Sequence, residues 1–338
     1  MSRVLITGGA SPLGAALAKR LLADPAYDVR VSDARPAPRW MREGCEIHRG
    51  DLRLSGQASA AAKGCPHVIH LARFEAPASA APWHTLLEYE AALHGAVLRA
   101  ALDRGVERLL YVSSPRVFER AELFPTPEEH LEQCPAPDSA RGFARLSGER
   151  LCMAAQQEHG LEFTICRPFG AYGPPAPHDT DPVEPEHDEQ QPMHGPAADL
   201  SDLIERAIAG EQPLEILGSD KRTLTPTHIE DLADGILAAL GSPAAANEDF
   251  NLAGTRELSL AEIATLARQA GGERADSLAL RQLSSPTPEP ERSHPSTQKA
   301  RDLLGWEARI ELEQGVAAIA EALAARAARG PIPATADA

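Results

Sequence analysis

The sequence lacks any apolar run near the roughly 18 residues that a membrane-spanning helix requires. It also lacks an excess of positive charge, because 33 lysines and arginines face 49 aspartates and glutamates and leave a formal net charge of −16. Such a chain repels nucleic-acid phosphates and anionic lipid surfaces, so we expect no nucleic-acid partner and no membrane partner. Its first residues, MSRVLITGGA, show no signal-peptide pattern, and we expect a cytoplasmic protein.

Cysteines are few and dispersed, and no two of them form a C-x-x-C pair. The five are Cys45, Cys65, Cys134, Cys152 and Cys166. An odd, scattered set is typical of reduced thiols buried as small apolar residues. We therefore predict no metal site and no cysteine nucleophile.

What the first half does contain is a regular alternation of strand and helix patterns. Strands are expected at Val4–Thr7, Val29–Ser32, Cys45–His48, His67–Ala72, Arg108–Ser114 and Glu162–Arg167. Between them lie helical patterns, among them Trp83–Arg104 and about Arg141–His159. This alternation predicts an α/β fold of the Rossmann type, a doubly wound parallel sheet with helices on both faces.

The most specific local pattern is Thr7-Gly8-Gly9-Ala10-Ser11-Pro12-Leu13-Gly14, between the first strand and the first helix. Glycines at such a turn let the backbone approach a pyrophosphate, and the helix N-terminus supplies N–H donors. Ser11 stands where a third glycine is usual, and a small hydroxyl can donate to a phosphate. We predict a dinucleotide site that includes Gly8, Ser11, Pro12, Leu13 and Gly14.

Asp33 follows Gly14 by 19 residues and ends the second strand. A carboxylate at this place accepts the ribose hydroxyls of an adenosine and repels a 2′-phosphate, which favours NAD over NADP. Arg35 weakens that preference. The alternative interpretation is a glycine turn that only joins strand to helix, but strand, turn, helix and acid in register favour the cofactor.

Several further segments together resemble one family, the extended short-chain dehydrogenase/reductases of the NAD-dependent epimerase/dehydratase group, which act on nucleotide sugars. The segments are Gly50-Asp51, His70-Leu71-Ala72, Val112-Ser113-Ser114, Arg167-Pro168-Phe169, Tyr172-Gly173-Pro174, His228-Ile229-Glu230-Asp231-Leu232-Ala233 and Leu304-Gly305-Trp306. The resemblance covers nearly the whole chain. It implies that Asp51, Leu52, Leu71, Ala72 and Pro168 also border the cofactor.

The resemblance also implies a division into two domains. After Pro168 the pattern changes, and helical patterns return from Leu200 to about Ala328. We predict an NAD-binding Rossmann domain from residues 1–168 and 225–250. A smaller C-terminal α/β substrate domain should comprise residues 169–224 and 251–329, with a disordered tail at 330–338.

The family's catalytic pattern is altered. Its members use a tyrosine to accept the proton of a sugar hydroxyl, a lysine four residues later and a serine or threonine. The segment Leu146–Glu149 sets the register and puts Arg145 at the lysine position and Arg141 at the tyrosine position, while Ser114 keeps the serine position. Arginine keeps its proton, with a pKa above roughly 12, so Arg141 cannot be the general base. Arg145 can still donate to the nicotinamide ribose.

Three functions therefore stay open, and the first is favoured. It is an NAD-dependent enzyme with oxidoreductase-type chemistry that acts on a nucleotide-sugar-like molecule with an atypical base. The second is a catalytically inactive NAD-binding sensor or partner protein, and the third is a scaffold without cofactor. The candidate substitute bases are Tyr111, His70, Glu119, His130 and Asp138.

Two more departures concern the substrate. The family's N-x-x-G-T asparagine is Ala92 here, and Leu224 replaces an arginine that meets a substrate diphosphate, although Lys221 and Arg222 could compensate. An acidic loop, about 178–199, has histidines and carboxylates without metal-ligand spacing, so we predict a solvated loop or a lid and no metal. By analogy with the family, helices Trp83–Arg104 and Arg141–His159 could form a homodimer.

Overall fold

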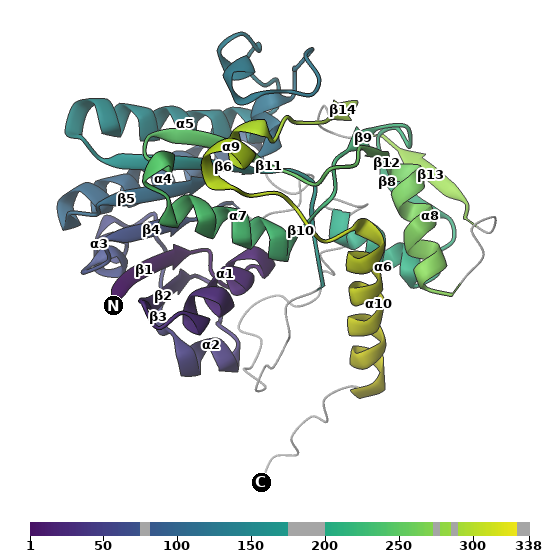
Figure 1. Ribbon diagram of the computed structural model, residues 1–338, viewed down its shortest axis with the longest axis horizontal. Coiled ribbons are helices and arrows are strands. Elements are labelled where there is room, and N and C mark those ends of the chain that lie inside the picture. The colour runs from purple at the N-terminus through teal and green to yellow at the C-terminus, as the bar shows by residue number, and fades with distance from the viewer. Residues whose placement is uncertain (75–81, 175–199, 273–277, 285–289, 330–338) are drawn as a thin grey trace.

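The computed structural model describes residues 1–74, 82–174, 200–272, 278–284 and 290–329. The expected acidic loop and the expected disordered tail therefore lie outside the described residues. Within the described part, the chain builds one large sheet with helices on both faces and a smaller group of elements at one end of it (Figure 1).

Seven parallel strands form the large sheet in the order β11-β6-β5-β4-β1-β2-β3. Their bounds are β1 Ser2–Thr7, β2 Tyr27–Asp33, β3 Glu46–Arg49, β4 His67–His70, β5 Arg108–Val112, β6 Glu162–Pro168 and β11 Glu248–Leu252. The chain order reverses between β1 and β4. In open sheets of this kind ligands bind at such a reversal, beyond the carboxyl ends of the strands.

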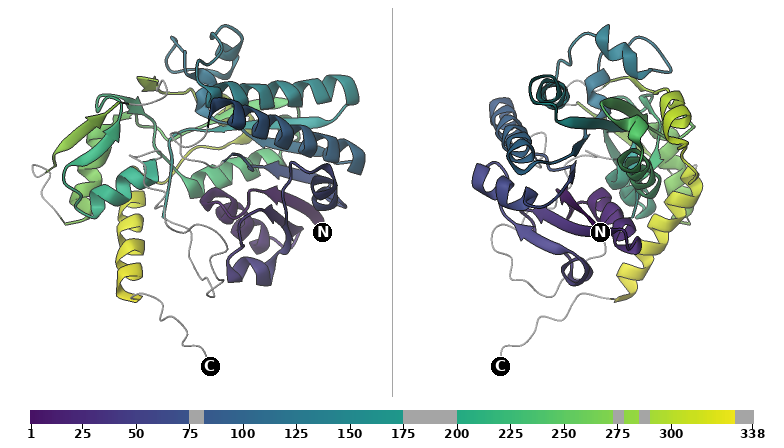
Figure 2. Two further views of the ribbon diagram at one scale, coloured as in Figure 1. Left: turned by 180° about the vertical axis from the view of Figure 1, so that it is seen from behind. Right: turned by 60° about the vertical axis from the view of Figure 1, so that its left-hand side comes forward.

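Helices cover both faces of this sheet, as Figure 2 shows. One apolar cluster joins the sheet to α1 Pro12–Ala23, α2 Arg39–Gly44, α7 Ile229–Gly241 and α9 Gln298–Leu304. The other joins it to α3 Ser55–Ala62, α4 Trp83–Arg104 and α5 Ala140–His159. The sheet therefore buries apolar side chains on both sides, which explains the nearly continuous apolar runs of the sequence.

The smaller group packs around a third apolar cluster. Its helices are α6 Leu200–Ile208, α8 Leu260–Ala270 and α10 Leu312–Arg329. Its strands are short: β8 Leu214–Leu217 pairs with β13 Leu280–Leu283, while β9 Thr223–Leu224 lies between β12 Leu258–Ser259 and β14 Arg292–Ser293. A further parallel pair consists of β7 Ala171–Tyr172 and β10 Thr227–His228.

The fold class expected from the sequence is confirmed. The chain crosses between the two groups more than once: Ala300 of α9 and Trp306 pack into a cluster of the large sheet, where the indole Nε1 of Trp306 donates to the Asp231 carbonyl at 3.0 Å. The domain boundaries drawn above stay a prediction. Among the described residues, no helix combines the length and the apolar character needed to cross a bilayer.

Candidate cofactor and ligand site

The glycine turn between β1 and α1 is built so tightly that side chains would not fit. Gly8 has φ +69°, and a Cβ there would lie 2.7 Å from the backbone nitrogen of Ala72. A Cβ on Gly14 would lie 2.6 Å from the Cα of Gly9. Both approaches are to backbone, which cannot move aside as a side chain can. The turn therefore forms the kind of bare backbone cradle that a pyrophosphate needs.

Ser11 shapes this turn with its own hydroxyl. The Ser11 Oγ donates to the Gly8 carbonyl at 2.7 Å and accepts from the Gly14 backbone N–H at 3.1 Å, which makes Ser11 the N-cap of α1. A serine cap is a common way to satisfy the first N–H groups of a helix. The sequence did not indicate this role. Donation from Ser11 to a phosphate stays a prediction.

Asp33 faces a cavity of about 370 Å³, which we call the Asp33 cavity. Its Oδ2 accepts from the Ala10 N–H at 2.9 Å, and the Arg35 guanidinium reaches both carboxylate oxygens, at 3.1 and 3.0 Å. The carboxylate thus links the second strand to the glycine turn and is already partly neutralised by Arg35. Five predicted cofactor residues line this cavity: Gly8, Asp33, Asp51, Leu52 and Ala72.

A second cavity of about 250 Å³, here the arginine cavity, lies beyond the ends of β4, β5 and β6. Six predicted cofactor residues line it: Ser11, Pro12, Leu13, Leu71, Arg145 and Pro168. Ser114 and Arg141 line it as well, so all three residues at the family's catalytic positions meet here. Of the residues predicted for the site, only Gly14 lines neither cavity, because it packs inside the turn.

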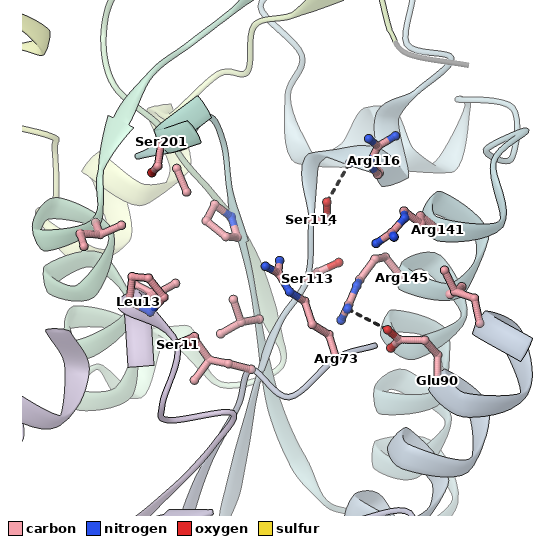
Figure 3. Close-up of a pocket in the computed structure, with 18 residues that line it drawn as sticks. Ser11, Leu13, Arg73, Glu90, Ser113, Ser114, Arg116, Arg141, Arg145 and Ser201 are labelled. Atoms are coloured by element: carbon pink, nitrogen blue, oxygen red, sulfur yellow. Dashed lines mark hydrogen bonds and ion pairs between the residues drawn. The ribbon is translucent and has the colours of Figure 1, made fainter. Parts of the chain in front are cut away.

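The close-up in Figure 3 shows what else this cavity contains. Arg73 and Arg116 enter it from the segments that follow β4 and β5, and Arg141 and Arg145 enter it from α5. Glu90 on α4 is the one carboxylate among the described lining residues. Sequence reasoning missed Arg73, Arg116 and Glu90. The two arginines stand one and two residues beyond segments already assigned to the site, and that position was the available signal.

Arg145 is held in place by an ion pair with Glu90. Its Nη2 lies 3.0 Å from Glu90 Oε1, and both side chains are buried. Burial alone would raise the pKa of Glu90, but Arg145 and then His94 outweigh it and hold that pKa at about 2. Glu90 also accepts the Phe74 backbone N–H at 2.8 Å. The pair therefore stays ionised at any ordinary pH.

Behind this ion pair runs a buried chain of histidines. Thr7 Oγ1 lies 2.7 Å from His70 Nδ1, and His70 Nε2 lies 2.9 Å from His94 Nδ1. The Nε2 of His94 then lies 3.0 Å from Glu90 Oε2 and 3.1 Å from the Tyr111 hydroxyl. Burial lowers the pKa of both histidines, so both are neutral. With neutral rings protonated on Nε2, Thr7 donates to His70 and His70 donates to His94, while the Nε2 proton of His94 faces both Tyr111 and Glu90.

Arg141 lies in the first turn of α5, which has no acidic residue. Its pKa is lowered by burial and then by the charges of Arg116, Arg73 and Arg145. A guanidinium group keeps its proton in proteins, so Arg141 is a cation and not a base. The tyrosine position of the family is thus occupied by fixed positive charge.

The candidate substitute bases do not reach the arginine cavity. Tyr111 and His70 are buried in the network just described, and burial raises the pKa of Tyr111. Glu119 accepts the Ser139 N–H at 3.1 Å and pairs with Arg116 at 3.1 Å, behind the wall. The other two, Asp138 and His130, also do not line it. Within the described ranges no group of three or more potential metal ligands occurs.

The far half of α5 keeps its position through a buried ion pair. Glu149 accepts two hydrogen bonds from Arg167, at 2.9 and 2.8 Å, and a third from the Ser113 hydroxyl at 2.5 Å. Arg167 also contacts Asp249 of β11 at 2.7 Å. Burial alone would lower the pKa of Arg167, but Glu149 and Asp249 raise it. This pair fixes α5 against β5 and β6, and so fixes where Arg141 and Arg145 lie.

A third cavity of about 310 Å³, here the Leu224 cavity, continues from the arginine cavity toward the smaller group. The two share Arg73, Ser114 and Arg116 among their lining residues. Leu224 and Arg222 both line the third cavity, whereas Lys221 does not. Arg222 therefore has the position to compensate for the arginine that Leu224 replaces, and Lys221 does not.

Comparison with known proteins agrees with this architecture. Residues 4–253 match the model of the NAD dependent epimerase/dehydratase family. UDP-glucuronic acid decarboxylase 1 of Xenopus tropicalis is 26% identical over 326 residues, which cover 93% of this chain and 70% of that protein. An uncharacterised UDP-glucose epimerase of Bacillus subtilis, YtcB, is 23% identical over 329 residues, covering 93% of this chain and 95% of its own.

Solved structures show the same fold. UDP-glucose 4-epimerase of Thermotoga maritima, with UDP-glucose, superposes with a TM-score of 0.81 at 22% identity and covers 96% of this chain and 99% of its own. UDP-glucuronic acid 4-epimerase from Bacillus cereus, in complex with UDP-glucuronic acid and NAD, gives a TM-score of 0.78 at 22% identity over 96% of this chain and 99% of its own. The chain belongs to the NAD dependent epimerase/dehydratase family.

Proposed function

We propose that this chain binds NAD along the carboxyl edge of its large sheet. The adenosine would lie in the Asp33 cavity, the pyrophosphate at the glycine turn and the nicotinamide end in the arginine cavity. The support is the backbone cradle, where a Cβ at Gly8 or Gly14 would meet backbone atoms at 2.7 and 2.6 Å. When bound, NAD supplies a hydride acceptor, and the question is what this chain's residues can do beside it.

We infer that they do not perform the family's tyrosine-dependent proton transfer, and that the protein is an NAD-bound ligand-binding member without that oxidation step. One observation carries this inference: Arg141, which we assign to the family's tyrosine position, lies at the wall of the arginine cavity. Apart from Glu90, the polar side chains of the described wall are serines and arginines. Arginines and serine hydroxyls do not accept protons near neutral pH, and the carboxylate that Ser113 contacts, Glu149, is paired with Arg167.

The ligand is proposed to be a nucleotide sugar or a similar molecule. Its support is the continuity of the arginine and Leu224 cavities, which gives an elongated molecule room on the side of the nicotinamide. Ser114 borders both cavities, so it is placed to orient such a ligand, and Arg222 is placed to meet a diphosphate. The relatives named above carry UDP-sugar names, and this supports the substrate class without fixing the sugar.

A second candidate, an oxidoreductase with Glu90 as base, rests on one observation. Glu90 is a carboxylate on the wall of the cavity. Against it stand the ion pair with Arg145 and a pKa of about 2, which make Glu90 a weak base. The loss of a well-matched base typically costs about 10²–10⁴ in rate.

The first experiment is to denature the purified protein and identify released small molecules by mass spectrometry, with thermal shifts on added NAD and NADP. Released NAD, or a shift with NAD, supports the proposal. If no NAD is released and NAD gives no thermal shift, a scaffold without cofactor is the better description. Hydride transfer to NAD is then followed by absorbance with UDP-glucose and UDP-glucuronic acid.

We expect no measurable transfer from the natural protein, and a gain in the double variant Arg141→Tyr with Arg145→Lys. Transfer by the natural protein that disappears in Glu90→Gln would overturn the proposal in favour of the second candidate. If the double variant shows no gain in hydride transfer with either UDP-sugar, this counts against a pocket derived from a sugar-oxidising enzyme.

A further inference from the structure

The arginine cavity carries an unusual concentration of positive charge for this chain. The protein as a whole has a formal net charge of −16. Yet Arg73, Arg116, Arg141 and Arg145 line this one cavity, and Glu90 is the single acid among its described lining residues. Arg73 and Arg116 also line the adjoining Leu224 cavity. Charge of this sign in so small a volume raises the local concentration of anions.

Arg141 lies among other cations. It is in the first turn of α5, at the positive end of the helix dipole, where an acidic residue would be stabilising. It is half-buried, and burial first, then the charges of Arg116, Arg73 and Arg145, lower its pKa. An anion bound between such cations reduces their mutual repulsion.

Among the described residues, two acids pair with these arginines. Glu90 pairs with Arg145 at 3.0 Å, and Glu119 pairs with Arg116 at 3.1 Å while also accepting the Ser139 N–H. Glu119 does not line the cavity, so its charge acts from behind Arg116. In Figure 3 the labelled arginines enter from the segments that follow β4 and β5 and from α5. Three separate segments thus contribute arginines to the wall of one cavity.

We propose that Arg73, Arg116 and Arg141 form a binding site for an oxyanion, a carboxylate or a phosphate, carried by the sugar part of the ligand. This inference rests on the proposed function and deepens it: where the family's tyrosine would meet a sugar hydroxyl, this chain meets an acid. Arginine suits the task because its planar fork donates two parallel hydrogen bonds to a carboxylate or phosphate. Ser114, on the same wall, supplies a further donor.

The alternative occupant of the three arginines is the pyrophosphate of NAD itself. Position argues against it for Arg116 and Arg141: they do not line the Asp33 cavity, and in Figure 3 they lie across the arginine cavity from Ser11 and Leu13 of the glycine turn. Arg73 lines both and could serve either anion. Arg141→Gln and Arg116→Gln are therefore the informative variants, and NAD affinity is the measurement that separates the two occupants.

Binding is measured by calorimetry on the full chain with NAD present, using UDP-glucuronic acid and UDP-glucose as a pair that differs in the acid. The natural protein should bind UDP-glucuronic acid at least tenfold more tightly than UDP-glucose. Arg141→Gln and Arg116→Gln should each weaken binding of the acid about 10- to 100-fold, as expected for loss of a charge-assisted hydrogen bond, and change UDP-glucose and NAD by no more than about twofold. Arg301→Gln, an exposed arginine of α9, removes the same charge elsewhere and should change nothing.

Inorganic phosphate tests whether the three arginines bind a phosphate, and this test does not depend on nucleotide-sugar binding. Phosphate should raise the Tm of the natural protein and of Arg301→Gln more than that of Arg141→Gln. Equal phosphate shifts in all three, with equal affinity for the two UDP-sugars, would overturn the oxyanion site. A tenfold loss of NAD affinity in Arg141→Gln would assign the arginines to the cofactor instead. Failure of both sugars to bind, with the phosphate difference intact, would refute the nucleotide-sugar proposal and leave the anion site standing.

Discussion

The two sides of the site are held in different ways. On the β1–α1 side, close backbone contacts define the shape of the glycine turn, and Asp33 accepts a hydrogen bond from it. On the β5–α5 side, the helix keeps its place through Glu149 and Arg167, and arginines stand at the two positions that we assign to the family's tyrosine and lysine.

This difference teaches that the scaffold and the reactive groups are held by separate interactions. The cradle depends on backbone spacing, so few substitutions preserve it. The chemistry on α5 depends on the side chains at two positions, whose exchange leaves the buried ion pair one turn further along intact. A site can therefore keep its cofactor geometry and its fold while its proton-transfer groups are replaced, because the fold alone implies no chemistry.

The largest effect should come from breaking the scaffold of α5. Glu149→Gln removes one charge of the fully buried pair with Arg167 and leaves that guanidinium compensated only in part, by Asp249. We expect a loss of about 3–5 kcal/mol in the free energy of unfolding, measured by urea denaturation. Glu158→Gln, exposed on the same helix, is the control and should change it by less than about 0.5 kcal/mol. A small loss in Glu149→Gln would mean that apolar packing alone positions the helix.

The cradle can be broken with one methyl group. Gly14→Ala puts a Cβ against backbone atoms of Gly9, so the turn must open. We expect NAD affinity to fall about 100-fold, measured by calorimetry, which corresponds to about 2.7 kcal/mol. Gly56→Ala is the matched control, because a Cβ there meets nothing within 4 Å and α3 should gain about 0.5–1 kcal/mol in stability. NAD affinity unchanged by Gly14→Ala would separate the turn from cofactor binding.

Much of the fold followed from local patterns. The expected helix over Trp83–Arg104 has those bounds in the structure, and Gly105 ends it in the left-handed conformation. Six of the seven strands that form the large sheet were expected as apolar runs between helical patterns. The short helices α2, α3 and α9 were not, because six to eight residues carry too little periodicity to be distinguished from loop.

The site was predicted less completely, and for a physical reason. The turn and Asp33 form a continuous pattern in one strand–helix–strand unit, so spacing identifies them. The residues that meet Arg145 at the cavity come from elsewhere in the chain. Glu90, its ion-pair partner, lies 55 residues earlier on α4, and Arg73, which lines the same cavity, follows a different strand. Which charged side chains converge on one cavity depends on tertiary packing, and spacing along the chain carries no signal of it.

The buried histidines offer a test through pH. His70 and His94 have lowered pKa values in the folded protein, so the unfolded chain binds protons that the folded one does not as pH falls below about 6.5. Stability is therefore fully present above that pH and is lost below it, by about 1.4 kcal/mol per pH unit for each histidine. The folded groups that face this pair are Glu90, Arg145 and Tyr111.

Replacing His70 with asparagine should remove one of these contributions. We expect the slope of unfolding free energy between about pH 6.5 and 5.5 to fall by about 1 kcal/mol per pH unit, whatever the loss in absolute stability. The window lies above the range in which Glu90 titrates in the unfolded chain, so that carboxylate does not contribute. His159→Asn, exposed at the end of α5, should leave the slope as it is. A slope that His70→Asn does not change would mean that the buried ring is protonated.

The smallest effect concerns which cofactor the cradle prefers. The negative charge of Asp33 should disfavour a 2′-phosphate, but Arg35 binds both of its carboxylate oxygens and offsets part of that charge. Asp33→Asn keeps an oxygen for the Ala10 N–H while it removes the charge and releases Arg35 toward the phosphate. We expect the ratio of NADP to NAD dissociation constants, measured by calorimetry, to fall about tenfold, or about 1.4 kcal/mol. Arg35→Gln should move the ratio the opposite way, and if both variants leave it unchanged, the adenosine does not lie against Asp33.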